Sequence, residues 1–175
     1  MFSFLVPILG VMAIILNAIG MAIKDVIKTK ILIGASVVLI IPDLYQSGGI
    51  HGVYQSVIVA TMYFVGALEY KKIERLILYS IPFFSLILFW GLKEYEGLFL
   101  IIASISTPLA TISKDSFKMK ILLLISTLSW GTYAVLMQAW FALSFDILGG
   151  LALIYFFRKY RKEKKAKELL EAVYT

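Results

Sequence analysis

Cysteine is absent from the 175 residues, and histidine occurs once, as His51. Without cysteine there can be no disulfide framework and no thiolate metal site. A single histidine without neighbouring carboxylates is a poor metal ligand, so we assign His51 to an outer turn at the membrane interface. We therefore expect neither a metal ion nor another cofactor.

Charge is also scarce in this chain. Charged residues make up 16% of it and hydrophobic residues 61%, whereas a typical soluble domain is about half hydrophobic. The composition therefore indicates a protein of the lipid bilayer. Apolar stretches bounded by charged residues predict seven membrane spans. Their ranges are 3–23, 31–45, 50–68, 74–91, 97–112, 119–137 and 139–158.

Basic residues are almost missing from one side of this predicted membrane protein. Of the 17 lysines and arginines, sixteen fall in one set of alternate loops, and the other set holds only Lys93. Because basic residues are retained on the cytoplasmic side, we predict a cell-membrane protein with its amino terminus outside and its carboxyl terminus in the cytoplasm. The basic tail, 161–175, is expected to continue the last span as a helix and to meet anionic lipid headgroups. This distribution argues against nucleic acid as a partner, despite the net charge of +6.

The chain repeats itself at an interval of ninety residues. The stretch 114–162 aligns without a gap on 24–72, and nine of the forty-nine positions are identical, including three lysines and an aspartate at the same kind of helix junction. We therefore predict an all-α membrane protein with seven transmembrane helices in a 3-1-3 arrangement of two parallel three-helix repeats. The first repeat spans 1–69, a linker helix spans 70–96, and the second repeat spans 97–160.

Polar residues inside predicted spans point to a solute path, because they are costly in hydrocarbon. Asp146 is the most informative, since no lysine or arginine lies in the middle of any span to neutralise it. Trp130 is predicted at the same depth, and an indole face beside a polar acceptor suits a sugar ring, although a tryptophan can also simply fill helix contacts. Asn17 and Thr107 are ninety residues apart in the inner half of their spans, and Ser56 is the counterpart of Asp146.

The second half resembles a known transporter group. The segments Ser106–Leu109, Leu128–Ala134 and Phe145–Gly149 are similar to the second half of SWEET and SemiSWEET sugar uniporters of the PQ-loop superfamily. The resemblance implies that Trp130 stacks on the substrate and that Asp146 stands where the family has a substrate-binding asparagine. It also implies that Pro108 kinks its helix as a hinge.

Two further groups share features with this chain. The second half is also similar to YgjV-type bacterial inner-membrane proteins, which carry an acid at the position of Asp146. Vitamin transporters of the PnuC type share the predicted architecture. The proline–asparagine pair of SWEET and SemiSWEET transporters is replaced by Phe145–Asp146 in this chain, and their first-half asparagine is replaced by Ser56.

These observations predict a transporter that moves a small polar solute, with a sugar as the leading candidate, by alternating access between two three-helix halves. The substrate-binding residues would be Trp130, Asp146, Ser56, Asn17 and Thr107. One alternative is a proton-coupled transporter or exporter of amino acids, vitamins or cationic solutes, and another is a membrane sensor or assembly protein that transports nothing. No base, nucleophile or metal cluster accompanies Asp146, so we predict that the protein is not an enzyme. A homo-oligomer is compatible with this reading.

Overall fold

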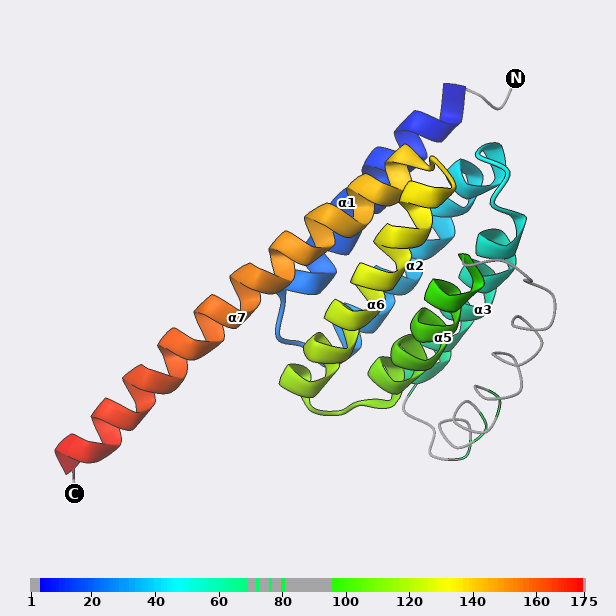
Figure 1. The fold of residues 1–175 in the computed structure, drawn as a ribbon. Coiled ribbons are helices and arrows are strands. Elements are labelled where there is room, and N and C mark those ends of the chain that lie inside the picture. The colour runs from blue at the N-terminus through cyan, green and yellow to red at the C-terminus, as the bar shows by residue number, and fades with distance from the viewer. Residues whose placement is uncertain (1–3, 69–71, 73–75, 77–79, 81–95, 175) are drawn as a thin grey trace.

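The computed structural model describes residues 4–68, 72, 76, 80 and 96–174. All regular structure within these residues is helical, which confirms the predicted all-α class (Figure 1). The predicted fourth span, 74–91, falls almost wholly outside the described residues. The described helices are α1 (Leu5–Ala22), α2 (Val26–Gln46), α3 (Ile50–Ala67), α5 (Glu96–Ile112), α6 (Ser116–Leu136) and α7 (Trp140–Tyr174).

Four of the described helices are long and apolar enough to cross a membrane. They are α1, α3, α6 and the part of α7 that ends at Ala172, and α5 adds a shorter apolar segment, Leu98–Ile112. In α3 and α6, 44% of the apolar stretch is buried inside the protein, and the rest is at least partly exposed. This pattern is that of a helical membrane protein.

Helices α2 and α6 begin at aspartate caps. Asp25 accepts a hydrogen bond from the backbone N–H of Lys28 at 2.9 Å, and Asp115 accepts one from the N–H of Lys118 at 2.9 Å. Each carboxylate satisfies a backbone donor that the first helical turn leaves unpaired. The sequence reading began these spans at residues 31 and 119, whereas the helices start at Val26 and Ser116, directly after their aspartate caps.

The ninety-residue interval recurs in the backbone. Adding 90 to the bounds of α2, 26 and 46, gives 116 and 136, the bounds of α6. The turns that follow also match, because Gly48 and Gln138 both have positive φ, at 81° and 54°. The N–H of Gly49 donates to the carbonyl of Leu44 at 2.9 Å, as the N–H of Ala139 does to that of Ala134 at 2.9 Å. We call α1–α3 the first half and α5–α7 the second half.

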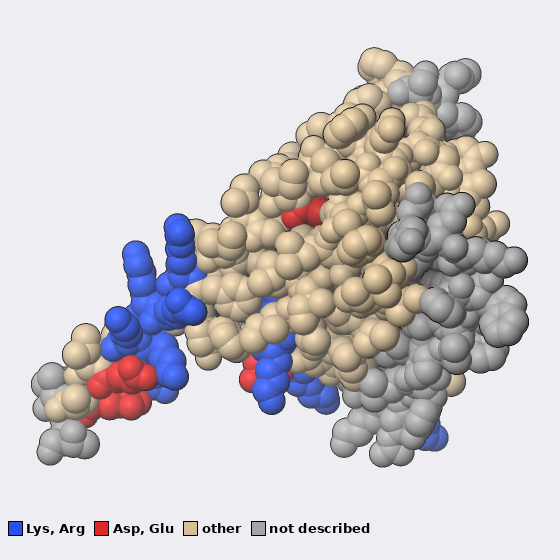
Figure 2. Space-filling view, viewed as in Figure 1, with Lys and Arg blue, Asp and Glu red and all other residues tan. Residues whose placement is uncertain are grey.

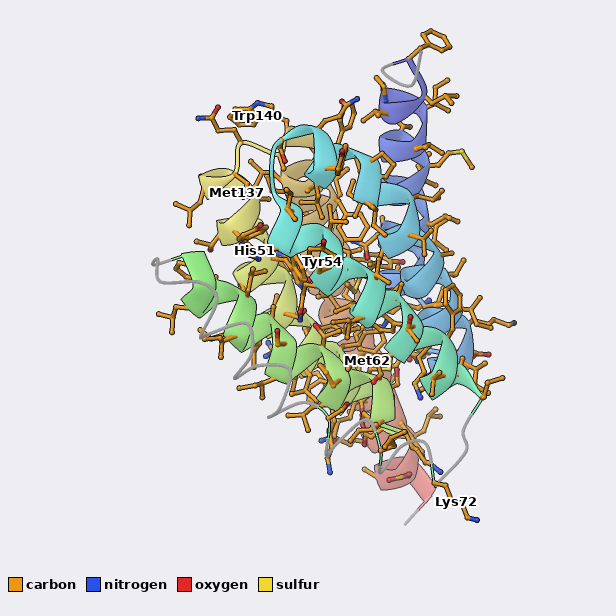
Figure 3. The ribbon with its side chains drawn as sticks, turned by 90° about the vertical axis from the view of Figure 1, so that its right-hand side faces the viewer. His51, Tyr54, Met62, Lys72, Met137 and Trp140 are labelled. Atoms are coloured by element: carbon orange, nitrogen blue, oxygen red, sulfur yellow. The ribbon has the colours of Figure 1, made fainter. Side chains whose placement is uncertain are left out.

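The described helices form a closed ring. Each contacts the next in chain order, α3 packs on α5, and α7 returns to pack on α1. We call the end with the turns 47–49 and 137–139 the turn end, and the end where α2 and α6 begin the basic end. Figure 3 shows Met137 and Trp140 at the turn end and Lys72 at the other, and the visible lysines and arginines gather at the basic end and on the protruding part of α7 (Figure 2). The ring encloses the core between these two ends.

Helix α7 continues through the basic tail, as predicted. It runs for 35 residues and leaves the body of the protein beyond the basic end (Figure 1). Lys24, in the junction between α1 and α2, forms an ion pair with Glu163 on this extension. Because both side chains are about half exposed, the pair is expected to stabilise the tail's position by less than about 1 kcal/mol.

Candidate functional site

A small cavity lies inside the ring of helices. Its volume is about 50 Å³, and all six described helices contribute to its wall. The five side chains predicted to bind substrate all line it, although they come from five different helices. They are Asn17 of α1, Ser56 of α3, Thr107 of α5, Trp130 of α6 and Asp146 of α7. The structure therefore brings the predicted residues together, and their binding role stays a prediction.

Asn17 contributes an unpaired hydrogen-bond acceptor to this cavity. Its side chain is fully buried, and its Nδ2 donates to the backbone carbonyl of Phe145 at 3.0 Å. Its Oδ1 has no partner among the described residues. Leaving a buried acceptor unpaired costs about 1–3 kcal/mol, so this oxygen favours a bound donor, either water or a solute.

Among the described residues, Asp146 is the only charged one in the cavity wall. It is 8% exposed, and no residue in the described part of the chain donates a hydrogen bond to its carboxyl group or pairs with its charge. Gly131 faces it from α6, where an added Cβ would lie 3.4 Å from the Cβ of Asp146. A carboxyl group with this much burial and no partner is suited to bind a proton, a cation or a hydroxyl donor.

Hydroxyl groups and aromatic rings complete the wall. Thr107 Oγ1 and Ser126 Oγ are 2.6 Å apart and share a hydrogen bond. Trp130 meets the ring of Tyr133 edge-on, with centroids 5.9 Å apart. Helix α5 continues through Pro108, whose carbonyl accepts a hydrogen bond from Thr111 Oγ1 at 2.7 Å, and the hinge role of Pro108 stays a prediction.

Sequence reasoning missed Tyr63 as a cavity residue. It is buried and lines the cavity together with Ser56 and Val59. These three residues follow the i, i+3, i+7 spacing of one helical face. The signal was therefore present on α3, but the ninety-residue comparison did not reveal it because the counterpart of Tyr63 is Leu153.

Hydrogen bonds join the two halves at the turn end. Asp43 Oδ2 accepts from the backbone N–H of Ala142 at 2.9 Å, and Tyr133 Oη accepts from the N–H of Gly52 at 3.1 Å. Positions 43 and 133 are ninety apart, as are 52 and 142. A side chain of α2 therefore caps the first turn of α7, and a side chain of α6 caps the first turn of α3, so each half caps a helix of the other.

Two fully buried lysines lie at the basic end. Lys120 Nζ donates to the carbonyl of Gly20 at 2.7 Å and to Thr29 Oγ1 at 3.2 Å, so it joins α6 to the first half. Lys30 Nζ donates to the carbonyl of Gly66 at 3.0 Å. Both carbonyls belong to the last turn of a helix, where acceptors are unpaired and the helix dipole favours a cation. The sequence reading counted both lysines with the basic loops, although its sixth span, 119–137, included Lys120, and in the structure Lys30 belongs to α2 and Lys120 to α6.

The family comparison covers nearly the whole chain. Residues 4–166 match the model of the family Imp-YgjV, described as a bacterial inner membrane protein, and no curated protein and no solved structure matches. The resemblance to YgjV-type proteins is thereby confirmed and extends to both halves, whereas the comparisons do not support the resemblance to SWEET-like PQ-loop transporters. With its apolar helices, the chain belongs to the Imp-YgjV family of bacterial inner membrane proteins.

Proposed function

We propose that the protein is a transporter that carries a small polar solute across the bacterial inner membrane. Its seven spans would form the 3-1-3 arrangement, with the amino terminus outside and the carboxyl terminus in the cytoplasm. The observation that carries the proposal is the convergence of Asn17, Ser56, Thr107, Trp130 and Asp146 on one cavity inside the bundle. Polar groups are rarely kept inside a membrane protein unless they bind something or hold helices together.

The chemistry of the cavity favours a solute rich in hydrogen-bond donors. Asn17 Oδ1 and the Asp146 carboxyl group offer acceptors that no described residue satisfies. The indole face of Trp130 would stack on the apolar face of a sugar ring while these acceptors bind its hydroxyls. A sugar is therefore our first candidate.

The second candidate is a cationic solute, or a solute carried together with a proton. Asp146 favours it, because the cavity wall holds no basic residue to neutralise a carboxylate. An ammonium group or a proton would supply the missing charge. Amino acids, vitamins with a basic group and other amines belong to this class.

Hydrogen bonds between the two halves lie at both ends of the bundle that holds the cavity. The cavity's volume of about 50 Å³ has room for a few water molecules and is far below the roughly 300–1,000 Å³ of ordinary ligand sites. The Asp43–Ala142 and Tyr133–Gly52 hydrogen bonds lie at the turn end, and the Lys120 hydrogen bonds to Gly20 and Thr29 lie at the basic end. In alternating access one set would break while the other held, and this would widen the cavity toward one side at a time.

Uptake into proteoliposomes tests the proposal. Labelled sugars, amino acids and vitamins would be offered with and without a proton gradient. Trp130→Ala is expected to reduce uptake of the transported solute at least about tenfold, by loss of stacking. Trp140→Ala is the matched control, because Trp140 is 67% exposed and lies outside the cavity wall.

Asp146→Asn separates the two candidates. Sugar uptake is expected to survive, since an amide oxygen still accepts hydrogen bonds. Uptake of a cation, or dependence on the proton gradient, is expected to disappear. If neither Trp130→Ala nor Asp146→Asn changes the rate of uptake, this cavity is not the transport site.

Other roles have less support. A sensor or assembly protein has no need of an internal cavity with an unpaired acceptor, and we propose a role in transport rather than in catalysis. Anionic headgroups are the proposed partners of the basic tail, at about 1 kcal/mol per basic residue near the surface. A homo-oligomer is compatible with the proposal.

A further inference from the structure

A second hollow opens on the outer face of the ring, between α6 and α7. This groove has a volume of about 470 Å³. Its walls are apolar, and Leu128, Ile147, Leu151 and Ile154 are each between 45% and 65% exposed there, as expected for side chains that face lipid. The groove is thus open to the hydrocarbon of the bilayer.

Asp146 belongs to this groove as well as to the central cavity. Figure 2 shows one small acidic patch on the uncharged face over α6 and α7. Asp146 is the only acidic residue between Ser116 and Arg158. A carboxyl group that is nine-tenths buried and unpaired among the described residues therefore lies at the floor of an apolar, lipid-facing groove.

We propose that this groove binds an amphipathic amine that enters from the bilayer. Its ammonium group pairs with the Asp146 carboxylate, and its hydrocarbon chain lies along the apolar walls. Thr127, which also lines the groove, offers a hydroxyl oxygen to a second ammonium N–H. The inference goes beyond the proposed function, because it requires binding at this groove and not transport.

Charge selects this occupant over two others. A lipid acyl chain fits the apolar walls but leaves the carboxylate without a partner. A second copy of the chain has no lysine or arginine in the apolar parts of the described spans that face lipid, so it brings no cation to this depth. An amine in its ammonium form satisfies both the walls and the carboxylate.

Glycines keep the groove open. A Cβ on Gly150 would meet only Thr127 Cγ2, at 3.9 Å, which is an ordinary contact. A larger side chain at this position can therefore occupy the groove without forcing α6 and α7 apart. Gly150→Leu is accordingly a blocking variant that leaves the Asp146 carboxyl group in place.

The test is calorimetric titration of the purified chain in phosphatidylcholine nanodiscs, with empty nanodiscs subtracted. Octylammonium is expected to bind saturably and about tenfold more tightly than butylammonium, because only the longer chain fills the groove. Octanoate, which has a chain of similar length and the opposite charge, is expected not to bind. Equal binding of octanoate would overturn the proposal in favour of a lipid-chain site.

Variants then locate the site. Asp146→Asn and Gly150→Leu are each expected to weaken octylammonium binding about tenfold or more, by loss of the ion pair and of the space. Val57→Leu is the control, since Val57 is lipid-exposed on α3 and lies outside the groove. If both groove variants bind octylammonium with unchanged affinity, the proposal is wrong. The absence of saturable octylammonium binding would also overturn it. This includes the case in which two copies of the protein pair within one nanodisc and cover each other's groove. Failure here with sugar uptake intact would remove the groove site and leave the transport proposal standing.

Discussion

Asn17 reaches the backbone of α7 because residue 149 has no side chain. A Cβ on Gly149 would lie 2.6 Å from Asn17 Nδ2, which is closer than real Cβ contacts come. The next residue, Gly150, has room for a methyl group, with its nearest neighbour at 3.9 Å. Two adjacent glycines therefore have different reasons to be present, and only the first supports the Asn17–Phe145 hydrogen bond.

Gly149→Ala is expected to lower the free energy of unfolding by about 1–3 kcal/mol, because the methyl group displaces Asn17. Gly150→Ala is expected to leave it unchanged or to raise it by up to about 1 kcal/mol, through the better helix propensity of alanine. Thermal unfolding in detergent, followed by intrinsic fluorescence, compares the two. Equal effects of the two variants would contradict the proposed packing of Asn17.

At the residue scale, the polar residues that line the cavity could be predicted from the sequence, but the hydrogen bonds between the halves at the turn end could not. Asn17, Thr107 and Asp146 could be found because a polar group stands out in an apolar span. The exchange between Asp43 and Ala142 and between Tyr133 and Gly52 could not, because a carboxylate and a phenol occupy equivalent positions and share no residue type. A comparison by identity does not detect two different side chains that accept the same kind of hydrogen bond.

At the scale of the elements, the two helical hairpins α2–α3 and α6–α7 differ in the residue that turns the chain. Gly48 has φ 81° and Gln138 has φ 54°. Glycine adopts positive φ without steric cost, whereas a residue with a Cβ is disfavoured there by about 1–2 kcal/mol. The second turn therefore carries backbone strain that the first does not.

Gln138→Gly is expected to raise the free energy of unfolding by up to about 1 kcal/mol, because the strain in the second turn disappears. Gln138→Ala is the control and is expected to give no gain, since alanine keeps the Cβ. The midpoint of thermal unfolding measures both. A stabilisation by Ala equal to that by Gly would place the effect in the glutamine side chain and refute the strain.

Element boundaries show why some of the fold could be read from the sequence. The positions of α1, α3 and α5 were predicted within a few residues because apolar runs define them. The starts of α2 and α6 were placed too late, since Lys28 and Lys118 were read as loop residues when they belong to the first helical turn. Hydropathy alone does not reveal a helix that begins at an aspartate cap among lysines.

At the scale of the molecule, one buried lysine ties the two halves together at the basic end. Lys120 is fully buried, donates to Gly20 and Thr29, and lies 5.5 Å from the centroid of the Phe156 ring. The sequence could reveal that this lysine repeats Lys30, but not that it crosses from α6 to the first half. Such a contact depends on how the halves pack, which no local pattern records.

Lys120→Met is expected to open the basic end, because methionine keeps most of the bulk and loses the hydrogen bonds to Gly20 and Thr29. The chain has no cysteine, so a single cysteine placed at Ser126, in the cavity wall, reports access. Its modification by a water-soluble maleimide in inside-out vesicles is expected to speed up severalfold in Lys120→Met. Lys118→Met, which changes an exposed lysine two residues away, is the control. Unchanged rates in both variants would show that Lys120 does not close this end.

Because α7 is long and continuous, a small tilt near its start displaces its far end by a larger distance. Asp146 lies near one end of this continuous helix, and Tyr174 lies 28 residues further on, or about 42 Å at 1.5 Å per residue. A tilt of about 10° at Asp146 would thus swing the far tip by roughly 7 Å. Packing of α7 on α1 and α6, including the contact between Phe117 and Tyr160, opposes that swing inside the body of the protein. Beyond it, the surface ion pair between Lys24 and Glu163 adds only a weak restraint. Small rearrangements around a solute would therefore be magnified into a displacement of the cationic arm along the membrane surface.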